Sequence, residues 1–68
     1  MKLSPETRQL FLRNADMSCD SEDIYFCQDI LEALTDDKGQ ALNKLDVPVV
    51  GILSKAIQTY HEGAVSHD

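Results

Sequence analysis

The chain has little of what catalysis or membrane insertion requires. Its 68 residues include no tryptophan, three glycines and two prolines, and they contain neither a glycine-rich phosphate loop nor a Ser/His/Asp set. No apolar run approaches the ~20 residues of a membrane span. A chain this short also leaves little room for a ligand pocket of the usual size. We therefore expect neither an enzyme nor a bound cofactor.

Cysteine and histidine are equally scarce, and their spacing does not indicate a metal site. Cys19 and Cys27 are separated by seven residues, whereas zinc-binding cysteines usually lie two to four residues apart. We expect Cys27 to be a small core residue and Cys19 to lie in a loop near acids, which disfavour a reactive thiolate. His61 suits the end of a helix, and His67 falls in the C-terminal tail. No signal-peptide core follows Met1, so the protein is expected to be cytoplasmic with reduced thiols.

One segment lacks basic residues altogether. Residues 18–37 contain no lysine or arginine, and the formal net charge of the whole chain is −6. The segment's seven acids are Asp20, Glu22, Asp23, Asp29, Glu32, Asp36 and Asp37. This balance disfavours binding to nucleic acid or to an anionic membrane, where lysine and arginine must meet phosphates. It favours a basic protein partner.

Helix start and stop signals predict three helices over residues 5–16, 21–37 and 47–62, followed by a frayed tail over 64–68. The expected N-caps are Ser4, Asp20 and Asp46. Gly39 and Gly63 are expected to end the second and third helices, because glycine readily adopts the left-handed conformation found there. Between these helices, residues 40–45 are expected to form a short helical turn that points Leu42 and Leu45 inward. The fold class is therefore all-α.

The second and third helices each carry an apolar face about half a cylinder wide, which is more than one helix contact requires. In the first helix, Phe11, Leu12 and Ala15 share one side, whereas Leu10 points elsewhere. We expect a small three-helix bundle built on an antiparallel helical hairpin and completed by homodimerisation, because a core of this size is marginal. A self-sufficient monomer is the alternative. The expected oligomer interface consists of Phe26, Ile30, Ala33, Ile52 and Ile57.

The polar side of the second helix is the candidate partner-binding surface. Tyr25 lies there among acids, and an exposed aromatic side chain surrounded by charges is typical of protein interfaces. The expected contact residues are Tyr25, Asp29, Glu32 and Asp36. The competing interpretation is that these acids only solubilise an outer face. Exposed helices commonly mix charge signs, however, and this one does not.

The third helix resembles part of a DNA-binding family. Residues 52–60, ILSKAIQTY, resemble the second helix of ribbon-helix-helix repressors. The N-terminal strand of that family has no counterpart here, because Ser4 and Pro5 start a helix instead.

That resemblance suggests an alternative function, a small transcriptional regulator that dimerises through residues 47–62. Its DNA contacts would come from Lys2, Arg8 and Arg13. The turn around Asp46 would also fit a helix-turn-helix motif, but its recognition helix would carry a single base, Lys55. Nucleic acid is therefore the less favoured partner.

In size, charge and helical character, the chain as a whole resembles the small acidic accessory proteins of temperate bacteriophage early regions. The resemblance rests on no motif, so it assigns no functional residue. It implies a non-enzymatic regulatory protein that binds and modulates a host or phage protein.

Overall fold

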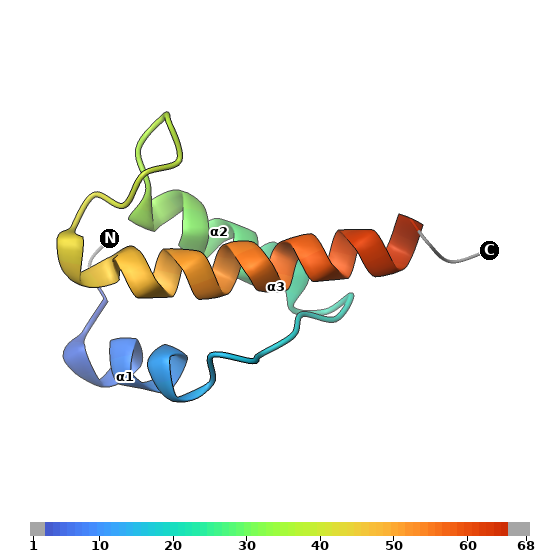
Figure 1. Cartoon of the computed structure of the whole chain (residues 1–68), viewed down its shortest axis with the longest axis horizontal. Coiled ribbons are helices and arrows are strands. Elements are labelled where there is room, and N and C mark those ends of the chain that lie inside the picture. Colours follow the sequence, from blue (N-terminus) through green and yellow to red (C-terminus); the bar gives the residue numbers. More distant parts are fainter. Residues whose placement is uncertain (1–2, 66–68) are drawn as a thin grey trace.

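The computed structural model describes residues 3–65, which form three α-helices (Figure 1). These are α1 (Pro5–Arg13), α2 (Ile24–Leu34) and α3 (Val47–Val65), and a 3-10 turn, η1 (Lys44–Asp46), directly precedes α3. The described residues contain no strand, although an isolated bridge pairs Thr35 with Ala41. The all-α prediction is confirmed.

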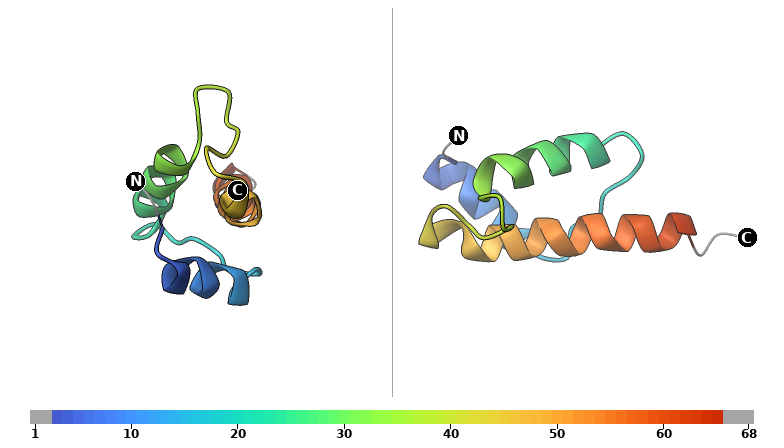
Figure 2. Two further views of the ribbon diagram at one scale, coloured as in Figure 1. Left: turned by 90° about the vertical axis from the view of Figure 1, so that its left-hand side faces the viewer. Right: turned by 90° about the horizontal axis from the view of Figure 1, so that it is seen from above.

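The long helix α3 is the element against which the other two pack. Seen along its axis, α1 and α2 lie on different sides of it (Figure 2). The start of α2 lies beside the second half of α3, where the Nε2 atoms of Gln28 and His61 are 3.3 Å apart. The two helices therefore run in opposite directions.

Helix α1 begins where the sequence predicts and ends earlier. The Ser4 hydroxyl accepts a hydrogen bond from the Thr7 N–H at 3.2 Å, and Pro5 occupies the first turn. The helix stops at Arg13 rather than at residue 16, because the backbone of Asn14 leaves helical geometry. The Asn14 side-chain amide donates to the Leu10 carbonyl at 2.7 Å and so satisfies a carbonyl that the ended helix leaves free.

Helix α2 is shorter than expected at both ends. Asp20 caps a turn that precedes α2: its Oδ1 accepts from the N–H groups of Glu22 and Asp23, both at 2.9 Å. The helix itself starts only at Ile24. The helix ends at Leu34, since Thr35 is extended and its hydroxyl donates to the Leu31 carbonyl at 2.7 Å.

Gly39 has the expected left-handed backbone, with φ of 80°, but it does not end α2. It lies in the turn between Asp36 and Gln40, five residues beyond the helix. The Asp36 carboxylate holds this turn by accepting from the N–H groups of Lys38 and Gln40, both at 2.9 Å. The glycine signal therefore marked a tight turn instead of a helix terminus.

The approach to α3 also differs from expectation. Leu42 and Leu45 are 67% and 63% exposed, so the prediction that they point inward is wrong. Asn43 caps η1 by accepting from the Leu45 N–H at 2.9 Å, so the helical turn covers Lys44–Asp46 and not the expected residues 40–45. Helix α3 continues through Gly63 to Val65, so the predicted stop is wrong as well. Of the predicted tail, residues 66–68, which include His67, lie outside the described residues.

The core forms mainly between α2 and α3. Its buried apolar side chains are Leu3, Ile24, Cys27, Ile30, Leu34, Val49, Leu53 and Ala56. None of the nine described residues of α1 is buried; Phe11 and Leu12 pack against the core while staying half-exposed. Each fully buried leucine or isoleucine contributes roughly 1.5–3 kcal/mol. Most of the hydrophobic stabilisation therefore comes from the α2–α3 pair.

A buried ion pair attaches α1 to the start of α3. Arg8 Nε donates to Asp46 Oδ1 at 2.8 Å, and Asp46 is the one charged side chain that is buried among residues 3–63. The sequence suggested Asp46 as an N-cap. Its carboxylate instead meets a base 38 residues away in the chain.

Candidate functional site

The outer side of α2 carries the most distinctive exposed surface of the chain. Tyr25, Asp29 and Glu32 follow one another at i, i+4 and i+7, so they form one stripe on the helix. All three are exposed, and Tyr25 is 73% accessible to solvent. The opposite side of α2 carries Ile24, Cys27, Ile30 and Leu34 into the core.

Phe26 extends this stripe into a wider surface. It was expected to be covered by a second copy, and in the monomer it is 66% exposed beside Tyr25. Asp29 lies four residues after Tyr25 and three after Phe26, which makes it a neighbour of both on the next turn of the helix. We call Tyr25, Phe26, Asp29 and Glu32 the acidic–aromatic face.

Asp36 does not belong to this face. Helix α2 ends at Leu34, so the i+4 relation to Glu32 that would have aligned Asp36 with the stripe is lost. Its Oδ1 is occupied by the backbone of the turn between Asp36 and Gln40. Three of the four expected contact residues, Tyr25, Asp29 and Glu32, therefore share one surface.

The five expected interface residues do not form one exposed patch. Ile30 is buried within its own chain, and Ala33, Ile52 and Ile57 are half-buried. Ile57 packs against the monomer core. Phe26 is the one member that is largely exposed. It lies at the edge of the apolar side of α2, whereas the core covers the centre of that side.

The basic residues proposed for DNA contact are also not brought together. The Arg8 guanidinium is paired with Asp46, and Arg13 is exposed at the end of α1. Lys2 lies outside the described residues. A guanidinium already neutralised by a buried carboxylate has little capacity left for a phosphate.

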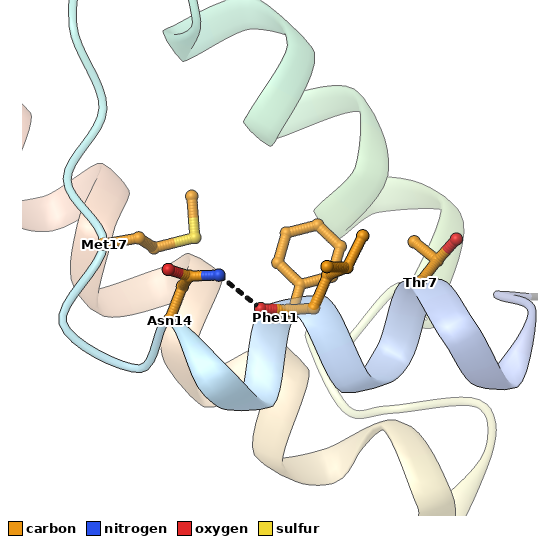
Figure 3. A pocket seen from close by; sticks show the side chains of 5 residues that line it. Thr7, Phe11, Asn14 and Met17 are labelled. Carbon is orange, nitrogen blue, oxygen red and sulfur yellow. Dashed lines mark hydrogen bonds between the residues drawn. The ribbon is translucent and has the colours of Figure 1, made fainter.

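A shallow apolar groove runs along α1 (Figure 3). It has a volume of about 280 Å³ and is lined by Thr7, Leu10, Phe11, Asn14 and Met17. The lining contains no titratable side chain, so it offers an apolar contact and no acid–base chemistry. This groove was not expected from the sequence, where Leu10 was set apart from Phe11, although the lining residues Thr7, Leu10, Phe11 and Asn14 follow helical spacing.

The two cysteines lie near each other at the start of α2. The pKa of the Cys27 thiol is raised from 9.0 to about 12, mainly by burial and to a lesser extent by the Cys19 thiol and the carboxylates of Asp23 and Asp20. At neutral pH Cys27 is therefore a neutral thiol, which makes it a poor nucleophile.

Among residues 3–65 no three His, Cys, Asp or Glu side chains are grouped so that they could hold a metal ion. In the same range, none of the helices is both long and apolar enough to cross a membrane. Comparisons with protein-family models, curated proteins and solved structures gave no match.

Proposed function

We propose that this chain is a non-enzymatic binding protein that recognises a basic protein surface through the acidic–aromatic face. The observation that carries this proposal is the exposure of two consecutive aromatic residues, Tyr25 and Phe26, in a segment, residues 18–37, that has no base.

The two parts of this face supply different components of binding. A tyrosine or phenylalanine ring buries a large area with few rotatable bonds and is therefore a typical anchor. Asp29 and Glu32 flank the rings, and rim charges of one sign attract an oppositely charged partner during encounter. A lysine- or arginine-rich surface with an apolar cleft for the rings fits both components.

Preorganisation further supports the proposal. The inner side of α2 is anchored by four buried side chains, so the outer side keeps a fixed geometry without a partner. Ordering such a surface on binding costs little conformational entropy, and more of the contact free energy remains for affinity.

Homodimerisation is a second part of the proposal. The antiparallel α2–α3 pair serves as the hairpin on which the bundle is built, and a second copy covers apolar side chains that the monomer leaves exposed. The favouring observation is the size of that set, which outside the acidic–aromatic face includes Leu10, Leu42, Leu45 and Val47. Covering two or three of them would add several kilocalories per mole to a marginal core, at roughly 1.5–3 kcal/mol for each fully buried side chain.

The proposed setting follows from the resemblance to small acidic phage proteins: a cytoplasmic regulatory protein that modulates a host or phage protein by contact. DNA binding is the weaker alternative, because Arg8 is already paired and the chain has a net charge of −6.

The proposal is tested by affinity capture with four versions of the full chain. Wild type and Asp16→Lys, which alters an exposed acid outside the acidic–aromatic face, should retain the same basic protein. Tyr25→Ala combined with Phe26→Ala should lose it, and Asp29→Lys combined with Glu32→Lys should lose it as well. Retention of the same protein by all four would reject the acidic–aromatic face as the binding surface.

A further inference from the structure

The fold brings together the two cysteines, which the sequence places in different elements. Cys19 lies in the segment between α1 and α2, and Cys27 lies within the first turns of α2. The chain turns back between them, because the Asp20 carbonyl accepts from the N–H groups of Asp23 at 3.2 Å and Ile24 at 3.0 Å. This turn returns Cys19 to the core cluster that contains Cys27.

The two thiols therefore lie in the same part of the core. Cys19 packs against the core while staying partly open to solvent, whereas Cys27 is only 3% exposed. The Cys19 thiol lies close enough to Cys27 to help raise the pKa of its thiol. Both are free thiols.

We propose that Cys19 and Cys27 form an oxidisable dithiol that closes reversibly into an intramolecular disulfide, with a small-molecule disulfide such as oxidised glutathione as the electron acceptor. This inference does not depend on the proposed partner-binding function.

The reaction proceeds by two thiol–disulfide exchanges. The Cys19 sulfur gives up its proton and attacks one sulfur of the small disulfide; that S–S bond breaks, and the first small thiol leaves with a proton. The Cys27 sulfur then gives up its proton and attacks the Cys19 sulfur, which breaks the mixed disulfide and releases the second small thiol. Two protein thiols are oxidised to one disulfide, and one small disulfide is reduced to two thiols.

Exposure assigns the order of these steps. Cys19 reaches solvent and can meet the reagent, whereas Cys27 is enclosed by its own chain. Burial holds the pKa of Cys27 near 12, so its thiolate is scarce and the second exchange is the slower one. Once Cys19 is in a mixed disulfide, its thiol no longer contributes to that raised pKa. The product is neutral, so the burial that disfavours a thiolate does not disfavour the bridge.

The bridge would join the segment before α2 to α2 itself. The loop that it closes includes the Asp20–Asp23 turn and both exposed rings, Tyr25 and Phe26. Closing a loop restricts the unfolded chain, so the oxidised protein should melt at a higher temperature than the reduced one.

The test is a redox titration of the full chain in mixtures of reduced and oxidised glutathione, read by acid quenching, alkylation and intact-mass measurement. We expect a monomer lighter by two hydrogen atoms, with a Cys19–Cys27 linkage in the peptide map and full reversal by dithiothreitol. The same titration in urea measures the unfolded chain. Because the fold holds the thiols together, reducing the disulfide of the folded chain should require at least about tenfold more reduced glutathione than reducing that of the unfolded chain in urea.

Two variants separate the roles of the thiols. Cys27→Ala should stop at the glutathione mixed disulfide on Cys19, and Cys19→Ala should react slowly, since its remaining thiol is buried. A wild-type chain that stops at a mixed disulfide, or that links two chains through Cys19, would overturn the proposal. A bridge that is no more stable in the folded chain than in urea would overturn it too.

Discussion

Arg8 and Asp46 form a largely buried ion pair that joins the middle of α1 to the residue preceding α3. The guanidinium Nε lies 2.8 Å from Oδ1, and the two side chains are 17% and 4% exposed. Because α1 contributes no fully buried side chain, this pair and the half-buried Phe11 and Leu12 are what hold α1 in place.

The first prediction concerns this pair. Arg8→Ala should lower the free energy of unfolding by about 3 kcal/mol, because removal of one partner leaves the other charge buried without compensation. Urea denaturation followed by circular dichroism is the measurement. Arg13→Ala, which removes an exposed base from the same helix, should cost less than about 1 kcal/mol. Equal losses in the two variants would show that the pair contributes no more than a surface charge.

Arg8→Met combined with Asp46→Leu tests whether the charge or the packing matters. Replacing both partners removes the unpaired charge, so much of the stability lost in Arg8→Ala should return. If the double variant were as unstable as Arg8→Ala, the lost stability would be due to side-chain packing and not to an unpaired buried charge.

The helices were predictable from local signals, and their contacts were not. Ser4 and Pro5 mark the start of α1 correctly, and the apolar spacing of Ile24, Cys27, Ile30 and Leu34 gives the buried side of α2. Helix ends were misplaced where a side chain takes over a backbone bond, as Asn14 and Thr35 do. Nothing in their local sequence requires either residue to end a helix.

Contacts between residues far apart in the sequence could not be predicted from local sequence patterns. Arg8 and Asp46 are 38 positions apart, and each alone resembles an ordinary surface charge. Asp36 was assigned to the binding face because helical periodicity was extended past Leu34, whereas its carboxylate serves the following turn. The stripe of Tyr25, Asp29 and Glu32 could be predicted because it lies on one helix, where spacing alone decides which side chains are neighbours. Phe26 was assigned to the apolar side of the helix, and its exposure was not predicted.

The second prediction compares two positions once assigned to the same interface. Ile30→Asp should destabilise the chain by at least about 3 kcal/mol, because it places a charge in the core. Phe26→Asp introduces the same side chain at an exposed position and should leave helical circular dichroism unchanged. If Phe26→Asp unfolded the protein and Ile30→Asp did not, the orientation of α2 would be wrong.

The third prediction concerns alkaline pH under reducing conditions. The unfolded chain loses the Cys27 proton near 9.0, whereas the folded chain keeps it to about 12. The contribution of this thiol to stability is therefore constant below pH 9.0. It falls as pH rises from 9.0 towards about 12, because the unfolded state releases a proton that the folded state retains.

Cys27→Ala is the matched control for this effect. Tyrosines and lysines titrate in both proteins, so the difference between their unfolding free energies isolates the thiol. That difference should shrink above pH 9.0 in urea denaturation series. A constant difference from neutral pH to pH 12 would contradict the raised pKa.

The fourth prediction is self-association. Sedimentation equilibrium at micromolar concentration should give a mass above the 7.6 kDa of one chain, because several large apolar side chains are uncovered in the monomer. Leu42→Ser combined with Leu45→Ser should weaken the association, and Glu6→Ser, at an exposed polar site on α1, should not. A single species of monomer mass across the concentration range would contradict the proposed homodimerisation.

The central claim, recognition of a basic partner by the acidic–aromatic face, is tested most directly by binding kinetics with the captured protein at two salt concentrations. Asp29→Lys combined with Glu32→Lys should mainly slow association, and the effect should diminish at high salt, since exposed charges are screened beyond about 8–10 Å. Tyr25→Ala should mainly speed dissociation and raise Kd at least about tenfold, as loss of an anchoring ring does. Rate constants left unchanged by altering Tyr25, Asp29 and Glu32 together would show that the acidic–aromatic face is only a solvated surface.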